Sequence, residues 1–243
     1  MNLILDIGNT RTKIGVFRGH RLVKKMVWDQ WTLRQVKELI EQKKITRVAL
    51  STVSGLKNPV DNFFKKHFYY INLNANTALP IQNRYKTPQT LGKDRLAAVV
   101  GAFAEYPDQH NLVIDAGTCI KYDLITADGD YYGGSISPGI EMRLKAMHHF
   151  TAKLPLVERG SLRNFVGTNT KTALQTGGQL GAVAEANGFI RWYEEKYGQI
   201  NVILTGGDSN FFAKKLKNRI FVNQNLVLTG LNKILNYNVE LSE

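Results

Sequence analysis

A pattern of strand, tight turn and strand occurs twice in this chain, about half a chain apart. The first turn is Asp6-Ile7-Gly8-Asn9-Thr10, which follows the apolar run 3–5, and the second is Asp115-Ala116-Gly117-Thr118, which follows the apolar run 112–114. Glycine lets the backbone approach a ligand closely, and successive N–H groups in such a turn can bind an anion. The repeat predicts a duplicated α/β unit, in which each half presents a phosphate-binding hairpin to a shared cleft.

Each turn taken alone has a simpler explanation, because Asp, Gly, Asn and Thr are common in ordinary hairpin turns. Two copies in matching contexts favour phosphate binding. We expect the carboxylate of Asp6, at the end of its strand, to hold a hydrated Mg²⁺ against the phosphates. Two orientations stay open for Lys13 on the departing strand, since its side chain could reach the phosphates or face solvent.

The composition is that of an ordinary globular protein. Of the 243 residues, 43% are hydrophobic and 21% are charged. The longest apolar stretch, 96–104, is far shorter than the ~20 residues that a membrane span needs, and the first residues do not resemble a signal peptide. The single cysteine, Cys119, excludes an intrachain disulfide and fits a cytoplasmic protein.

The formal net charge of +12 is compatible with two kinds of anionic partner. The basic residues are scattered, mostly at helical spacing, and no zinc-finger or RNA-recognition signature is present. We therefore expect attraction for small anions such as nucleotides, with nucleic acid as the alternative partner. Titration with duplex DNA at increasing salt separates the two, because nucleic-acid binding falls steeply with salt.

Hydrophobic periodicity predicts a two-lobed α/β protein, with lobes at 1–106 and 107–243. Beyond the repeated turns, strands are expected at 22–28, 47–51, 69–71, 122–126, 131–136 and 201–204. Helices are expected after Thr32 and Asn58, at 91–104 and 140–150, from 170 to 197 with breaks at glycines, and at 211–216 and 226–235. The order of strands and helices is the same in both halves.

A phosphoryl acceptor needs a base and a residue that holds it. Asp94 and Arg95 follow Gly92 at a helix start, where the carboxylate could take a hydroxyl proton and the guanidinium could bind a substrate carboxylate. The alternative is a first-turn acid beside a surface ion-pair residue. The glycine pair Gly206-Gly207 could support an adenosine or form a plain turn.

Six short motifs follow one another along the chain. They are 6–10, 91–95 with Gly101-Ala102, 115–118, 133–139, 151–155 and 167–170. In this order and spacing the chain resembles a type III pantothenate kinase of the sugar-kinase/actin superfamily, nearly from end to end. The resemblance implies a ribonuclease-H-like or actin-like βββαβα topology in each lobe, around a central nucleotide cleft.

The resemblance also implies an activity, ATP-dependent phosphorylation of pantothenate, the first committed step towards coenzyme A. Such enzymes need Mg²⁺ and are typically homodimers. The short apolar runs and the scattered basic residues predict no membrane partner and no nucleic-acid partner. Asp94 would be the general base. The ATP site would comprise Asp6, Ile7, Gly8, Asn9, Thr10, Arg11, Thr12, Lys13 and Thr118. The pantothenate site would comprise Tyr85, Gly92, Lys93, Asp94, Arg95 and Thr170, with Arg95 binding the carboxylate.

Some positions depart from the family pattern. Asp115 matches a position that binds a monovalent cation, K⁺ or NH₄⁺, in part of the family. Cys119 and Lys121 stand where alanine and a small residue are common, which weakens the expectation of such a cation here. Lys93 replaces a frequent alanine at a tolerant position. A kinase for another small hydroxy acid or a sugar remains the rival within the superfamily.

Overall fold

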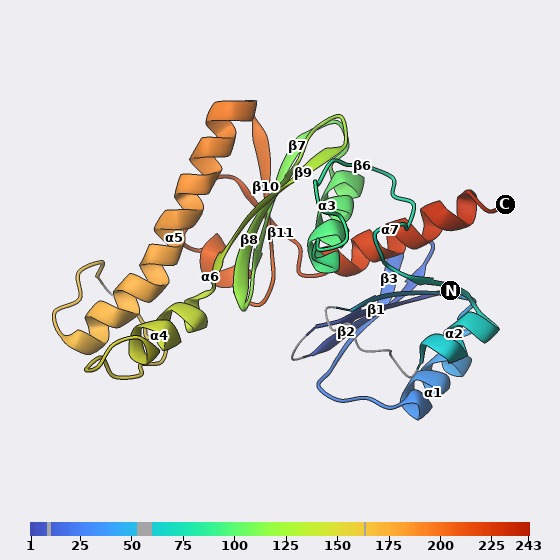
Figure 1. Cartoon of the computed structure of the whole chain (residues 1–243), viewed down its shortest axis with the longest axis horizontal. Helices are drawn as coiled ribbons and strands as arrows, with labels where there is room; N and C mark the ends of the chain where they lie inside the picture. Colours follow the sequence, from blue (N-terminus) through green and yellow to red (C-terminus); the bar gives the residue numbers. More distant parts are fainter. Residues whose placement is uncertain (9–10, 53–59, 163) are drawn as a thin grey trace. The chain divides into compact units, whose positions relative to one another are not determined.

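The computed structural model describes residues 1–8, 11–52, 60–162 and 164–243, and the chain forms two compact units. The first unit comprises 1–109, 125–133 and 225–243, and the second comprises 110–124 and 134–224. Figure 1 labels their helices and strands. The predicted division at 106/107 differs from these units, because the hairpin tip 125–133 and the last helix belong to the first unit.

Most elements of the first unit precede residue 110. They are β1 (Asn2–Ile7), β2 (Thr12–Arg18), β3 (Arg21–Trp28), α1 (Leu33–Lys43), β4 (Arg47–Thr52), α2 (Asp61–His67), β5 (Tyr69–Asn72), β6 (Gln82–Asn83), α3 (Lys93–Glu105) and, from the chain end, α7 (Leu226–Glu240). The elements that follow α3 are β7 (His110–Ala116), β8 (Cys119–Ile125), β9 (Asp130–Pro138), α4 (Ile140–His149), α5 (Thr170–Tyr197), β10 (Ile200–Thr205), α6 (Ser209–Ala213) and β11 (Ile220–Val222).

The two sheets repeat one strand order. The first sheet runs β3-β2-β1-β4-β5, and the second runs β11-β10-β7-β8-β9-β6. Read from β9, the second sheet has the same order of third, second, first, fourth and fifth strand, with β6 added at its edge. The strand that precedes each Asp-x-Gly turn, β1 or β7, pairs in parallel with the fourth strand of its set, β4 or β10. The predicted duplication of the fold is confirmed.

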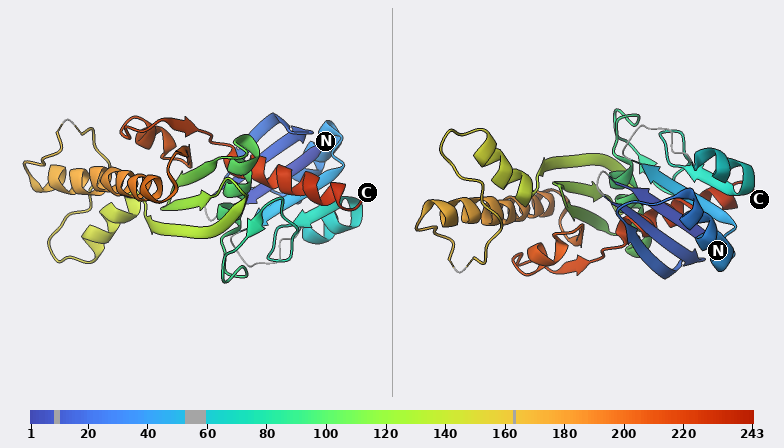
Figure 2. Two further views of the ribbon diagram at one scale, coloured as in Figure 1. Left: turned by 90° about the horizontal axis from the view of Figure 1, so that it is seen from above. Right: turned by 90° about the horizontal axis from the view of Figure 1, so that it is seen from below.

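Helices cover both faces of the first sheet. Alternate residues such as Leu3 and Leu5 share a core with Val36 and Leu39 of α1 and Phe64 of α2. Thr32 caps α1, as predicted, and its contacts with Gln35 form a capping box. On the other face, the Asn2 side chain donates hydrogen bonds of 2.8 Å to the side-chain oxygens of Asn232 and Asn236 in α7, and the views in Figure 1 and Figure 2 show α7 along the same strands.

The return of α7 to the first unit depends on two glycines. A methyl group at Gly101 of α3 would lie 2.5 Å from the carbonyl oxygen of Leu226, and one at Gly230 of α7 would overlap the carbonyl oxygen of Ala97. The two helices therefore cross in backbone contact, as the small residues of 97–104 indicate. A contact across more than a hundred residues explains why α7 counts with the first unit.

The second unit has its own core, formed by one face of its sheet, α4, α5 and α6. Ile114 and Tyr122 pack there with Leu144 of α4 and Ala186 of α5, and α5 lies along the sheet in Figure 1. The predicted breaks in α5 are wrong, since α5 is one helix of 28 residues. The 3-residue strand β11 was not predicted.

A polar cluster joins α4 and α5 to this sheet. The Glu185 carboxylate of α5 accepts hydrogen bonds from the Tyr122 hydroxyl at 3.0 Å, from Arg143 of α4 at 2.5 Å and from the Ser137 hydroxyl. Burial alone would raise the pKa of Glu185, but these hydrogen bonds together lower it below its ordinary value of 4.5. The cluster holds the beginning of α4 in place.

We expect Glu185→Gln to destabilise the protein by about 1–3 kcal/mol at neutral pH, because buried donors lose their charged acceptor. Since the folded pKa is depressed, the carboxylate stabilises the fold above pH 4.5 and this contribution is lost as pH falls through the folded pKa. Urea unfolding at several pH values should therefore show a smaller acid loss for the variant. Glu195→Gln, in an exposed pair with Arg191, is the control, and equal acid profiles for the variant and the wild type would contradict the assignment.

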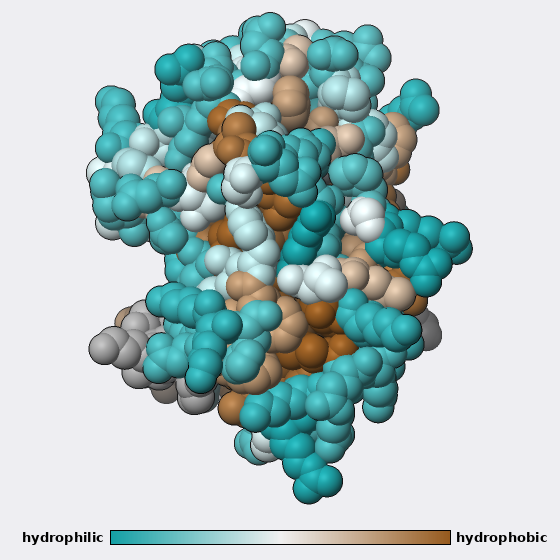
Figure 3. Space-filling view, turned by 90° about the vertical axis from the view of Figure 1, so that its right-hand side faces the viewer, coloured by the Kyte–Doolittle hydropathy of each residue, from teal (hydrophilic) through white to brown (hydrophobic). Residues whose placement is uncertain are grey.

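The surface is mixed in character. Hydrophilic side chains cover much of the face drawn in Figure 3, with smaller apolar areas between them. Within the described part of the chain, no helix is long and apolar enough to cross a membrane.

Candidate active site

The first hairpin follows β1. The N–H of Gly8 donates a 3.0 Å hydrogen bond to the carbonyl oxygen of Arg11. A methyl group at Gly8 would lie 3.1 Å from that oxygen, so a side chain here would crowd the backbone of Arg11. The predicted residues Asn9 and Thr10 lie outside the described residues.

Three polar side chains share one face at the end of the first sheet. Asp6 is 8% exposed, and its cross-strand partners are Lys13 on β2 and Ser51 on β4. Paired residues on neighbouring strands leave the same face, and Asp6 is four residues from Asn2, so this is the face that α7 covers. Lys13 therefore leaves the sheet on the same face as Asp6, and its role at the phosphates stays a prediction.

The group around Asp6 suits a hydrated Mg²⁺. This ion keeps several waters and takes one or two carboxylates together with substrate phosphates. Ser51 is fully buried, and among the described residues its hydroxyl has no hydrogen-bond partner. No group of three His, Cys, Asp or Glu side chains forms a metal cluster in the described ranges. The sequence analysis did not predict Ser51 as a neighbour of Asp6, because a serine at the end of a strand has no distinctive sequence signal.

Other predicted residues of the first hairpin have contacts within their own unit. Thr12 is buried, and its hydroxyl accepts a 3.0 Å hydrogen bond from the Trp31 indole. Arg11 forms an exposed ion pair of 2.9 Å with Asp29. Ile7 packs on the core beneath the sheet. Direct contacts of these residues with ATP stay predictions.

The first unit also contains the candidate base. Gly92 precedes α3, and Asp94 and Arg95 lie in its first turn. The Asp94 carboxylate accepts a 2.9 Å hydrogen bond from the N–H of Arg95. Arg95 is 5% exposed, and its guanidinium lies 5.7 Å from the centre of the Tyr85 ring. A side chain at Gly133 would meet that ring at 2.6 Å, so Tyr85 packs between a glycine and an arginine.

The structure brings together Tyr85, Gly92, Asp94 and Arg95 of the predicted pantothenate site. Lys93 instead lines a separate cavity of about 670 Å³. Lys65, Tyr70 and Asn72 line the same cavity. Burial lowers the pKa of Lys93, and the charge of Asp61 opposes this. Thr170, the exposed first residue of α5, belongs to the second unit, and its role stays a prediction.

Gly92 tests whether the position of the Asp94 carboxylate matters. A methyl group at Gly92 would lie 2.7 Å from Asp94 Oδ1, whereas the backbone there (φ −58°, ψ 123°) suits any residue. We expect Gly92→Ala to lower kcat by about ten-fold or more through a shifted carboxylate, with a nearly unchanged melting temperature. Gly177→Ala on α5, where nothing lies within 4 Å, should keep full activity. A fully active Gly92→Ala variant would show that catalysis does not depend on the observed position of the Asp94 carboxylate.

The second hairpin is tied to α4. The N–H of Gly139 donates a 3.0 Å hydrogen bond to the carbonyl oxygen of Thr118. A methyl group at Gly139 would overlap the carbonyl oxygen of Gly117 and lie 2.6 Å from that of Thr118. The beginning of α4 therefore lies directly against the turn, and the N–H groups of a first helical turn favour anions. Thr118 is exposed.

The turn between β10 and α6 contacts the same hairpin. The N–H of Asp208 donates a 2.9 Å hydrogen bond to the carbonyl oxygen of Ala116. Gly206 has φ +88°, and a side chain there would overlap this oxygen. Gly206 therefore provides both a left-handed turn and a close backbone approach. Both explanations of the pair Gly206-Gly207, support of an adenosine and a plain turn, remain compatible with this geometry.

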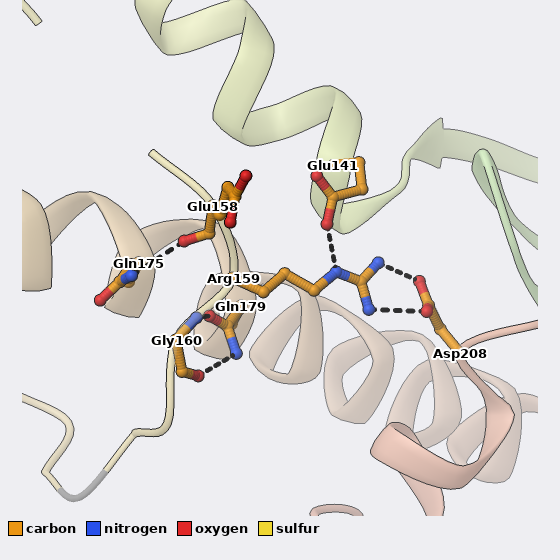
Figure 4. Close-up of polar contacts among 7 residues, drawn as sticks. All are labelled: Glu141, Glu158, Arg159, Gly160, Gln175, Gln179 and Asp208. Carbon is orange, nitrogen blue, oxygen red and sulfur yellow. Dashed lines mark hydrogen bonds and ion pairs between the residues drawn. The ribbon is translucent and has the colours of Figure 1, made fainter. Parts of the chain in front are cut away.

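Arg159 connects these two neighbours of the hairpin. Its guanidinium donates two 2.6 Å hydrogen bonds to Asp208 and one of 2.5 Å to Glu141 in the first turn of α4 (Figure 4). The adjoining loop is fixed to α5 where Gln179 contacts the backbone of Gly160 at 2.9 and 3.1 Å. Arg159 was missed, because an arginine in a loop has no sequence signal that names its partner.

The predicted cation position does not suit a free cation. Asp115 Oδ2 lies 2.7 Å from the ammonium nitrogen of Lys121, and their side chains are only 17% and 20% exposed. A monovalent cation at this carboxylate would lie beside the ammonium, a like charge in a mostly buried place. The residues present therefore do not fit K⁺ or NH₄⁺ at Asp115.

Comparison with solved structures shows that other proteins share this fold. A Campylobacter jejuni protein assigned to the Baf family of transcriptional activators has a TM-score of 0.61 at 24% identity, with 98% of this chain and 99% of that one covered. A ROK family protein from Streptococcus pneumoniae has a TM-score of 0.51 at 11% identity, with 99% of each chain covered. These likenesses concern the fold alone, which is a two-lobed α/β fold.

Sequence comparison identifies the family. The family model for type III pantothenate kinase matches residues 2–192. Two proteins with that name, from Christiangramia forsetii and Cytophaga hutchinsonii, are each 43% identical to this chain; the alignments cover 98% of this chain and 99% and 100% of the relatives. The chain belongs to the type III pantothenate kinase family, which confirms the resemblance.

Proposed function

We propose that this enzyme transfers the γ-phosphoryl group of ATP to the hydroxyl group of pantothenate, which yields 4'-phosphopantothenate, and that Asp94 is the general base. Pantothenate phosphorylation in coenzyme A biosynthesis is the activity of the family. The observation that carries the assignment of the base is the arrangement at α3, where the Asp94 carboxylate rests against Gly92 beside the buried Arg95.

The two hairpins have distinct roles in this proposal. Asp6 and Lys13, with the N–H groups of the first turn, bind the phosphates. Thr118 and the turn around Gly117, which belong to the second unit, also bind ATP. Asp6 would hold a hydrated Mg²⁺, and this ion would supply positive charge to the phosphates. Asp94 accepts the proton of the attacking hydroxyl group, and transfer proceeds in line. Arg95, held by Tyr85, binds the pantothenate carboxylate through its planar fork.

A coupled ATP-consumption assay over a panel of hydroxy acids and sugars tests the substrate. Pantothenate should be used in preference to pantothenyl alcohol, which has the same reacting hydroxyl group but no carboxylate for Arg95. Mass spectrometry should find a single phosphate on the product. Faster turnover of a sugar or another hydroxy acid would replace this proposal by the rival kinase.

Two further properties are part of the proposal. We expect a homodimer in the cytoplasm, which the family resemblance supports. Light scattering after size exclusion gives the mass directly, and a particle of one chain mass under assay conditions would contradict the dimer.

A further inference from the structure

Lys121 and Asp115 form an ion pair across the second hairpin. Asp115 is the last residue but one of β7, and Lys121 is the third residue of β8. The 2.7 Å distance between the ammonium nitrogen and Asp115 Oδ2 is that of a charge-assisted hydrogen bond. Both side chains leave the sheet on the face opposite the core of α5, because their neighbours Ile114, Ile120 and Tyr122 belong to that core.

The pair borders the backbone that we propose for ATP binding. A side chain at Gly206 would lie 2.6 Å from Asp115 Oδ1, so this second carboxylate oxygen faces the turn between β10 and α6. The next residue, Ala116, accepts the hydrogen bond from Asp208. One oxygen of Asp115 therefore faces the ammonium and the other faces the Gly206 turn.

A free cation would compete poorly at this position. At either oxygen of Asp115 it would lie beside the positive charge of Lys121 in a mostly buried place. The ammonium is tethered to the next strand, so it loses less freedom on binding than an ion drawn from solution. An ammonium group also carries the same single charge as K⁺ or NH₄⁺.

We infer that the ammonium of Lys121 takes the place of the monovalent cation at the second hairpin, so that ATP binding by this chain does not require K⁺ or NH₄⁺. In either case a single positive charge at Asp115 would hold the carboxylate beside the turn at Gly117 and Thr118. This inference rests on the proposed function, since it assumes that ATP binds at this hairpin.

Calorimetric titration with ATP and Mg²⁺ tests the inference without turnover. Wild-type protein is titrated in KCl, in NH₄Cl and in tetramethylammonium chloride, whose cation is too large for the site, at equal ionic strength. The Kd should agree within about two-fold across the salts. Lys121→Met keeps the alkyl stem without the charge, and its Kd in tetramethylammonium should rise by about ten-fold or more and recover with K⁺. A melting-temperature increase with K⁺, without nucleotide, should appear only in this variant.

Two variants complete the design. Lys121→Arg keeps a charge and should remain insensitive to K⁺. Lys145→Met removes an exposed lysine of α4 and should behave as wild type. A wild-type enzyme whose ATP affinity depends on K⁺ would overturn the inference, even if Lys121→Met does not fold. Unchanged ATP affinity of Lys121→Met in all salts would overturn it too. Salt-independent ATP binding without phosphorylation of pantothenate would refute the proposed function alone.

Discussion

Asp94→Asn should abolish phosphorylation of pantothenate while it leaves ATP binding and the fold nearly intact. The amide has the shape of the carboxylate, and its oxygen can still accept the hydrogen bond from the N–H of Arg95. It cannot take up the proton of the attacking hydroxyl group, and general-base catalysis contributes about 10²–10⁴-fold to such rates. We therefore expect kcat to fall by about that factor, with the Kd for ATP and the melting temperature close to wild type.

The control for this variant is Asp108→Asn, the same substitution at another aspartate. Asp108 is an exposed aspartate of the same unit with φ +57°, a conformation that asparagine tolerates, so its activity should be unchanged. A coupled assay measures turnover and calorimetry measures ATP binding. If Asp94→Asn kept more than about a tenth of wild-type kcat, another group would have to be the base.

The local patterns predicted most of the strands and the start of α3, because each depends on residues close in sequence. Asp, Gly and Thr after an apolar run determine a strand followed by a turn, and two such runs at matching positions imply the repeated strand order. Asp94 and Arg95 could be found in the same way, since both belong to the first turn of one helix.

Contacts between distant residues could not be predicted. Arg159 and Asp208 are 49 residues apart, and the sequence around either residue does not indicate that the two form an ion pair. The crossing of α3 and α7 depends on Gly101 and Gly230. A glycine in the sequence does not indicate which distant segment will pack against it. The result is that the boundary of the first unit is not a single point in the chain.

The glycines of α5 show why local preference misled the prediction there. A glycine in a helix interior costs about 1 kcal/mol relative to alanine, so several in one segment suggest breaks. The buried face of α5, which includes Leu174, Ala182 and Ile190, packs on the core of the second unit and offsets this cost.

A different glycine, Gly139, should be indispensable for the second hairpin. Its backbone angles (φ −69°, ψ 171°) suit any residue, so the strain in Gly139→Ala would come only from the new methyl group. That group would overlap the carbonyl oxygen of Gly117 and lie 2.6 Å from that of Thr118. Both contacts are with backbone, which cannot rotate away as a side chain can, so the hairpin or the beginning of α4 must move.

We expect Gly139→Ala to weaken ATP binding by about ten-fold or more, because crowding of this kind typically costs about 1–3 kcal/mol. Calorimetry measures the Kd, and thermal unfolding shows how much of the cost falls on the fold. Gly181→Ala, where nothing lies within 4 Å, should leave ATP binding unchanged. Unaltered ATP affinity of a folded Gly139→Ala protein would mean that the turn at Gly117 and Thr118 does not bind the nucleotide, because this substitution cannot be accommodated without moving that turn or the helix that adjoins it.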